Sequence, residues 1–93
     1  MIDSPGELRY LLLVGNRQAG VLRYGRKDGR LVLHHTEVDQ SVEGHGLGSR
    51  LVAGVLDDVR ARGLEIVPLC PFVRKYLERH PEHADLVAGS GAR

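Results

Sequence analysis

The hydrophobic pattern of the chain changes its period once, near residue 49, and this change constrains the fold most. Before it, three runs have the composition of β-strands: Glu7–Val14, Ala19–Tyr24 and Leu31–Val38. The segments between them, Asn16-Arg17-Gln18 and Lys27-Asp28-Gly29, are typical of tight hairpin turns. The first half of the chain is therefore predicted to form an antiparallel meander.

After this point the apolar residues recur with helical spacing. Between Ser49 and Arg62 they form one stripe of an amphipathic helix, made of Leu51, Val52, Val55, Leu56 and Val59. Asp58 and Arg62 are four residues apart on the opposite side, which is predicted to face solvent. Gly63 is placed to end the helix, because a glycine readily adopts the left-handed conformation found there.

A strand and a second helix follow. Leu64–Leu69 contains β-branched residues and suits a buried strand. A helix is predicted to begin at Pro71, where the missing N–H is not needed, and to stop at Pro81. Its expected apolar face consists of Phe72, Val73, Tyr76 and Leu77. Glu82–Val87 is expected to add a further turn, and residues 1–6 and 88–93 are expected to be frayed.

In order, the elements are βββαβα, an α/β (α+β) fold. A strand, helix, strand unit almost always crosses over right-handedly, so Leu31–Val38 and Leu64–Leu69 are predicted to be parallel neighbours. The antiparallel meander is thus joined to a parallel strand by a helical crossover. Ligands of such sheets bind beyond the carboxyl ends of the strands, which lie here near Val38–Ser49 and Leu69–Phe72.

The composition agrees with a single domain over residues 1–93. Hydrophobic residues make up 42% of the chain and charged residues 27%, as in ordinary globular domains. A net charge of +1 and only 4% aromatic residues disfavour nucleic acid as a partner. The longest apolar run, Leu11–Val14, is too short to cross a membrane. Cys70 is the single cysteine, so no disulfide framework is expected, and a cytoplasmic location is the simplest.

The segment Glu43–Ser49 follows a predicted strand and opens a predicted helix. Its three glycines allow the backbone to approach a ligand closely, and the free N–H groups of a helix start favour an anion such as a pyrophosphate. The segment lacks the Gly-Lys-Ser/Thr ending of a P-loop. It is not a dinucleotide-binding loop either, because neither Arg50 nor Leu51 is glycine. A tight strand-to-helix connection without a ligand remains the alternative.

Cys70 is predicted to lie at the start of the second helix, where the helix dipole favours a thiolate. Packing in the core is the alternative role for a buried cysteine. His34 and His35 are adjacent in a strand, so at most one is expected to point into a given cleft. One of them beside Cys70 would form a pair of base and thiol, although a histidine in a strand is more commonly a structural group.

A metal site is not predicted. Cys70, His80, Glu82 and His83 are potential ligands, but zinc sites in small domains draw on paired, closely spaced cysteines and histidines. Histidines near the end of a helix are better explained by a favourable interaction with the helix dipole.

Several segments together resemble a known family. They are His35–Val38, Glu43–Ser49, the segment Pro68–Val73 and the segment Tyr76–Glu82. On these residues the chain resembles the minimal, single-domain members of the GNAT superfamily of N-acetyltransferases, from about Leu8 to Val87. In the loop pattern Gln/Arg-x-x-Gly-x-Gly/Ala of that superfamily, Glu43 takes the first place and Gly46 and Gly48 match the glycines.

The resemblance implies a strand that splays from its parallel neighbour and acetyl-CoA bound in the gap, with its pyrophosphate on the glycine loop. The cofactor-binding residues it implies are Val38, Gly44, His45, Gly46, Leu47, Gly48 and Ser49. It also implies that His35 and Cys70 lie near the thiol end of the cofactor, as candidate catalytic residues.

The implied function is an acetyl-CoA-dependent N-acetyltransferase acting on an unknown amine, either a small molecule or a protein lysine or N-terminus. His35 or a water is the expected base, and Cys70 either protonates the leaving thiolate or first accepts the acyl group. The chain lacks the helices and strands with which larger members shape an acceptor site. A CoA-binding module without turnover is therefore the main alternative, and an interaction domain with a plain turn at the glycines is a third.

Overall fold

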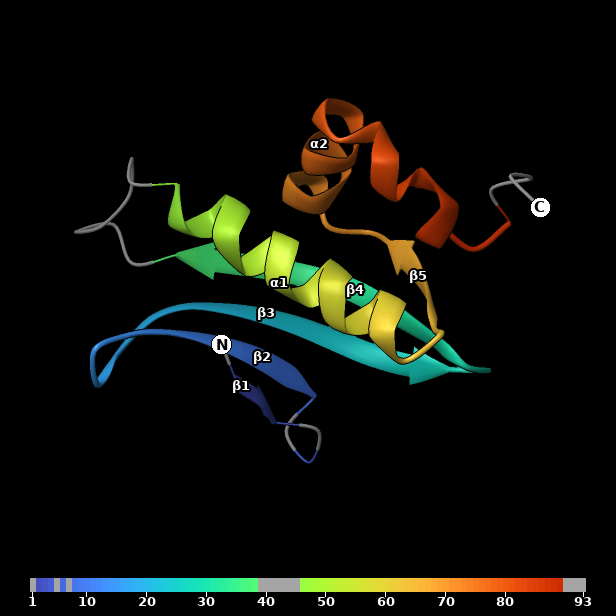
Figure 1. The fold of residues 1–93 in the computed structure, drawn as a ribbon. Helices are drawn as coiled ribbons and strands as arrows, with labels where there is room; N and C mark the ends of the chain where they lie inside the picture. The colour runs from blue at the N-terminus through green and yellow to red at the C-terminus, as the bar shows by residue number, and fades with distance from the viewer. Residues whose placement is uncertain (1, 5, 7, 39–45, 90–93) are drawn as a thin grey trace.

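The chain folds into a mixed five-stranded sheet with its helices on one side (Figure 1). The computed structural model describes residues 2–4, 6, 8–38 and 46–89. The strands lie in chain order: β1 (Ile2–Ser4), β2 (Arg9–Val14), β3 (Arg17–Lys27), β4 (Arg30–Val38) and β5 (Glu65–Pro68). Helix α1 (Leu47–Ala61) joins β4 to β5, and α2 (Pro71–Arg79) and the 3₁₀ helix η2 (Pro81–Leu86) follow. β1 to β4 pair antiparallel and β4 pairs parallel with β5, which confirms the predicted fold class.

Two of the hairpins, β2–β3 and β3–β4, turn on two residues each. Asp28 and Gly29, with φ of 53° and 75°, connect β3 to β4 as predicted, because a type I′ turn needs positive φ at both positions. Gly15 and Asn16 connect β2 to β3, with φ of 62° at the glycine. The turn expected at residues 16–18 is therefore misplaced, since Arg17 already pairs with Val14.

A strand forms where a frayed end was expected. Ile2–Ser4 pairs antiparallel with β2, and Ser4 lies opposite Arg9. A three-residue strand is too short to show a period in the sequence, which explains why it was missed. At the other end, the N–H of Ala88 donates to the carbonyl oxygen of Ile66 at 2.8 Å, while residues 90–93 lie outside the described residues.

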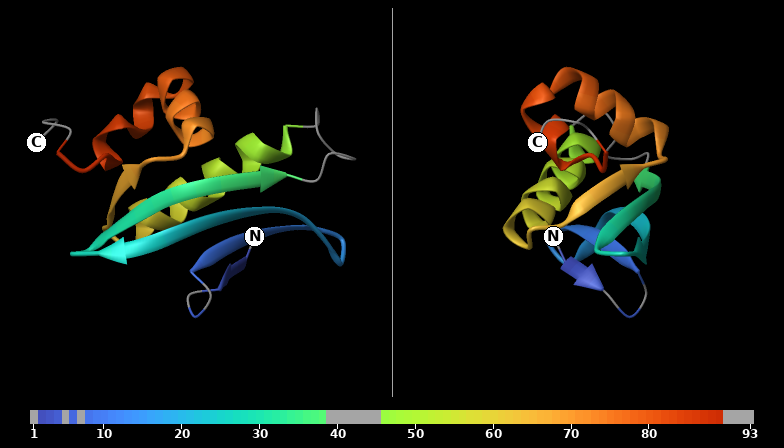
Figure 2. Two further views of the ribbon diagram at one scale, coloured as in Figure 1. Left: turned by 180° about the vertical axis from the view of Figure 1, so that it is seen from behind. Right: turned by 90° about the vertical axis from the view of Figure 1, so that its right-hand side faces the viewer.

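The core lies between the helices and the sheet face that they cover, here called the covered face; Figure 2 shows the helices on this side from two further directions. The predicted stripe of α1 is fully buried, with 0% exposure for Leu51, Val52, Val55, Leu56 and Val59. Against it pack strand residues that include Tyr10, Leu12, Leu22, Tyr24, Leu31 and Leu33. The helix phase is therefore confirmed, although α1 begins at Leu47, two residues earlier than predicted.

Three expectations about burial are wrong. Asp58 is not a solvent-facing residue: it is half-buried and accepts a hydrogen bond of 2.7 Å from the hydroxyl of the buried Tyr10. Phe72 and Leu69 were expected in the core, but they are 41% and 52% exposed. The chain leaves the sheet at Pro68, so the alternation that buries Ile66 does not continue through these residues.

An ion pair joins η2 to α1. The guanidinium of Arg60 donates to both carboxylate oxygens of Asp85, at 2.9 and 2.8 Å, and to the carbonyl oxygen of Glu82 at 3.3 Å. The hydrogen bond from Arg60 is the main cause that lowers the pKa of the Asp85 carboxyl. This ion pair therefore connects η2 to α1.

Candidate active site

The pairing of β4 with β5 stops at one carbonyl group. It runs from Arg30 opposite Glu65 to Leu33 opposite Pro68. There the N–H groups of both Leu69 and Cys70 donate to the carbonyl oxygen of Leu33, at 3.1 and 2.9 Å. β4 continues to Val38 while the chain after β5 turns into α2. Within the described part of the chain, no strand pairs with this side of β4 beyond Leu33.

A β-bulge at His34 reverses the alternation of side chains just where the two strands part. Tyr24 pairs with Leu33 and Arg23 with His35, so His34 is an extra residue in β4. Leu31 and Leu33 face the core before the bulge, and Val38 packs against the core after it. Residues 35 and 37 therefore point to the opposite side, here called the far face.

Both histidines lie on the far face. Nε2 of His35 is 3.0 Å from Oε1 of Glu37, and these two side chains are 58% and 62% exposed. Nε2 of His34 lies 3.1 Å from the point where a Cβ on Gly25 would be, so its ring covers that glycine. The expectation that only one of the two histidines could face a given side is wrong, because the bulge breaks the simple alternation.

Cys70 occupies the predicted position at the N-cap of α2, and its side chain is buried, with 2% exposure. Its sulfur lies 3.4 Å from the hydroxyl oxygen of Thr36. Thr36, and not His35, is thus the β4 side chain that contacts the thiol. The structure does not bring His35 and Cys70 together as a base and thiol pair, because the bulge turns His35 to the far face.

The first turn of α1 presents free N–H groups. Gly46 is the N-cap residue, with φ of 69° and no side-chain cap, and the N–H of Arg50 is the first to bond back to it, at 3.0 Å. The N–H groups of Leu47, Gly48 and Ser49 therefore have no acceptor within the helix. This turn has no acidic residue, so it suits an anion. The predicted loop residues Glu43, Gly44 and His45 lie outside the described residues.

Gly48 holds an aromatic ring against this turn. A Cβ at Gly48 would lie 2.6 Å from Cζ of Phe72, which is closer than two carbon atoms can come. The ring of Phe72 therefore occupies the space that a side chain at position 48 would take. The glycine thus allows α2 to pack closely on α1 at this point, in addition to the predicted contact with a cofactor.

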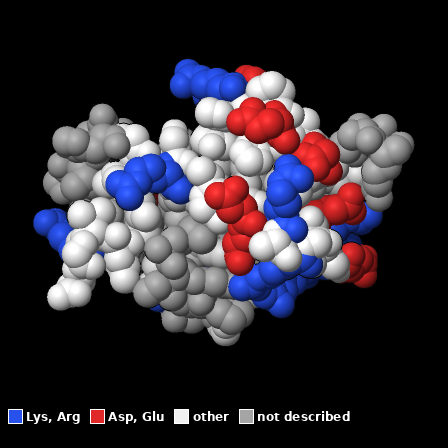
Figure 3. Space-filling view, viewed as in Figure 1, with Lys and Arg blue, Asp and Glu red and all other residues white. Residues whose placement is uncertain are grey.

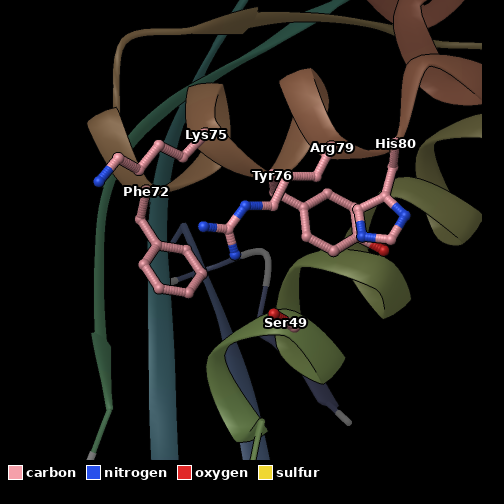
Figure 4. A pocket seen from close by; sticks show the side chains of 6 residues that line it. All are labelled: Ser49, Phe72, Lys75, Tyr76, Arg79 and His80. Carbon is pink, nitrogen blue, oxygen red and sulfur yellow. The ribbon is translucent and has the colours of Figure 1, made fainter.

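A hollow of about 130 Å³ lies between this turn and α2 (Figure 4). It is lined by Ser49, Phe72, Lys75, Tyr76, Arg79 and His80. Lys75 and Arg79 form no ion pair with any residue that the structure describes, so both charges are available to a ligand. The rings of Tyr76 and His80 stack at 4.1 Å, and burial raises the pKa of Tyr76. Lys75 and Arg79 were not among the predicted site residues, although their spacing of four residues places both on one side of a helix.

On the face of the molecule seen in Figure 3, acidic and basic side chains lie close together on the right, whereas the left part shows basic side chains only. Over residues 8–38 and 46–89, no three His, Cys, Asp or Glu side chains are grouped to hold a metal ion. None of the described helices is long and apolar enough to cross a membrane. The cytoplasmic location stays a prediction.

A comparison with protein families gives a match that covers most of the chain. The model described as GCN5-related N-acetyl-transferase matches residues 9–86, from the start of β2 to the end of η2. A search of curated proteins gives no match. The end of the pairing between β4 and β5 at Leu33 and the uncapped start of α1 are consistent with this match. The chain belongs to the GCN5-related N-acetyltransferase family, which supports a general role in acetyl transfer.

Proposed function

We propose that the protein is an N-acetyltransferase that uses acetyl-CoA and transfers its acetyl group to an amine. The observation that carries this proposal is the end of strand pairing at Leu33. It leaves the edge of β4 from there to Val38 without a strand partner among the described residues. An extended ligand with amide groups can pair with such an edge as a strand does. The pantetheine arm of CoA has this chemistry.

The two ends of that edge suit the two ends of the cofactor. At one end, the N–H groups of Leu47, Gly48 and Ser49 are available to the pyrophosphate. Lys75 and Arg79 lie beside them on α2 and are available to the remaining phosphate of CoA. At the other end, Cys70 and Thr36 lie where the acyl-bearing sulfur of an extended arm would come. Val38 is the last residue of that edge, at the end nearer the start of α1 in the chain.

In the proposed reaction, the amine nitrogen forms a bond to the carbonyl carbon of the thioester. The bond between that carbon and the CoA sulfur breaks, the nitrogen gives up a proton, and the sulfur leaves as a thiolate that takes up a proton. His35, on the far face, is the proposed acceptor of the first proton. Cys70, on the covered face, is the proposed donor to the leaving sulfur.

The positions of these two residues favour direct transfer over an acyl-cysteine intermediate. A cysteine that attacks a thioester needs a base to remove its proton. The side chain in contact with the Cys70 sulfur is the neutral hydroxyl of Thr36, whereas His35 lies on the other face. Amine and cofactor would approach the carbonyl from the two sides of the sheet, each with its own proton-transfer group.

Calorimetric titration with acetyl-CoA and with 3′-dephospho-CoA, followed by an assay of CoA release, tests the proposal. We expect binding of acetyl-CoA and weaker binding of the dephospho form. Lys75→Gln and Arg79→Gln should reduce this difference, while Arg26→Gln, an exposed arginine on β3, should leave it unchanged. Failure to bind acetyl-CoA would contradict the whole proposal. Binding without release of CoA to any amine would favour the binding module.

Two variants separate the proposed roles in turnover. Cys70→Ser should bind acetyl-CoA normally and turn over more slowly, and His35→Gln should lose the dependence of kcat on an ionising base. Full turnover by Cys70→Ser would exclude both the thiol acid and an acyl-cysteine. An unchanged pH profile for His35→Gln would leave water as the base.

A further inference from the structure

The far face of the sheet carries two rows of side chains that end at the candidate site. One row runs across the strands from Arg9 through Arg23 to His35, and the next from Leu11 through Val21 to Glu37. The neighbours of Arg23 along β3, Leu22 and Tyr24, belong to the core, which places Arg23 on the far face. The candidate base therefore has an arginine as its direct neighbour across the strands.

The charge in these strands is almost all positive. β2, β3 and β4 together contain one acidic residue, Glu37, and its carboxylate is already paired with His35. Arg23 is exposed and forms no ion pair with a described residue. Arg23 lies directly across from His35. An anion bound to Arg23 would therefore lie next to the side chain that is proposed to accept the proton of the amine.

The exposure of this face favours a polypeptide over a small molecule. Sites for small molecules are concave and bury most of the ligand. Here the side chains of His35 and Glu37 are 58% and 62% exposed, and Arg23 on β3 is exposed as well. Exposed charged and polar groups on two neighbouring strands suit an extended segment that lies across them.

We infer that the acceptor is a polypeptide whose lysine or N-terminal amine is flanked by acidic residues, and that Arg23 recognises those residues on the far face. This inference rests on the proposed function and adds its acceptor class. An acidic residue beside the amine pairs with the guanidinium of Arg23, and the amine is thereby held at His35. Ion pairs between exposed groups are weak individually. The preference should therefore be moderate and should fall as salt is added.

Two lysine peptides of equal length test this inference, one with glutamates around the lysine and one with arginines. With acetyl-CoA as donor, we expect kcat/KM for the acidic peptide to exceed that for the basic one by about tenfold, which corresponds to about 1.4 kcal/mol. Arg23→Glu should reverse the preference through KM. The matched control is Arg26→Glu, because Arg26 is exposed on the same strand but pairs with Leu31, which faces the core; it should keep the preference.

Other results would overturn the inference. Equal rates for both peptides, an equal effect of Arg23→Glu and Arg26→Glu, or acetylation of small amines alone would each exclude an acidic polypeptide as the acceptor. Calorimetry with acetyl-CoA on the same variants separates this failure from failure of the proposed function. In the first case acetyl-CoA still binds with unchanged affinity, and in the second it does not bind.

Discussion

The covered face and the far face of the sheet are built from the same strands but differ in what their side chains do. On the covered face, Leu22 and Leu33 are 0% exposed and pack against α1. On the far face, His35 and Glu37 are more than half exposed and contact each other. At the bulge at His34, the alternation of β4 side chains shifts, so that odd-numbered residues face the core before the bulge and the far face after it. Substitutions of the buried aliphatic residues on the covered face should therefore change stability, whereas those of the exposed residues on the far face should change function with little effect on stability.

The largest expected effect is on the covered face. Leu33→Ala should lower the free energy of unfolding by about 2–5 kcal/mol, because it removes buried methyl groups and leaves a cavity. Glu37→Gln on the far face should stay within about 0.5 kcal/mol. Urea denaturation of both variants measures this contrast. Comparable losses would show that the two faces do not divide stability from function.

The hydrogen bond from the buried Tyr10 hydroxyl to Asp58 links the outer side of α1 to the covered face, and its contribution to stability can be measured. Asp58→Ala removes the acceptor of this hydrogen bond and should cost about 1–3 kcal/mol. Asp57→Ala, one residue earlier and exposed, should cost less than about 0.5 kcal/mol. Both substitutions are also made in a Tyr10→Phe background, which lacks the hydroxyl. If Asp58→Ala and Asp57→Ala then cost the same, the hydrogen bond to Tyr10 accounts for the larger cost of Asp58→Ala in the native sequence. An equal loss from Asp57→Ala and Asp58→Ala in the native sequence would argue against it.

Two glycines with the same backbone conformation lie at opposite ends of α1, and they separate cofactor binding from helix stability. Gly46 has φ of 69° and Gly63 has φ of 68°, and a Cβ at either would meet nothing within 4 Å. Valine is strained at both. Only Gly46→Val should move the free N–H groups and weaken CoA binding by at least tenfold, or about 1.4 kcal/mol. Calorimetry that finds the same affinity for both variants would exclude the start of α1 from the cofactor site.

The smallest effect is expected at the edge of the helix layer, between α1 and η2. The pKa of Asp85 is lowered in the folded protein, chiefly by Arg60. Its ion pair therefore adds stability above the ordinary pKa of about 3.9, and this is lost as the pH falls through the folded value. Asp85→Asn should be less stable than the native protein at pH 7, and the two should converge in acid. Asp57→Asn is the control, and a difference that persists in acid would contradict the role of this pair.

The order of the elements and the meander joined to a parallel strand were predictable because their signals are local. The apolar stripe from Leu51 to Val59 lies within a single helix, and the signal for the turn at Asp28-Gly29 lies within two residues. The position of Cys70 at a helix start follows from Pro71 beside it. The sequence therefore placed Cys70 correctly at the start of α2, while its catalytic role stays a prediction.

The orientation of His35 was decided only by the tertiary structure. The alternation of Leu31 and Leu33, continued along β4, would place His35 on the covered face beside Cys70. The extra residue His34 shifts that alternation and puts Thr36 there instead. A bulge forms because of how two strands pair, here between Arg23 and Tyr24 of β3, and not because of the sequence of β4 alone. Local sequence thus determined which residues lie near the end of β5, whereas the pairing of β3 with β4 determined which face of the sheet each side chain points to.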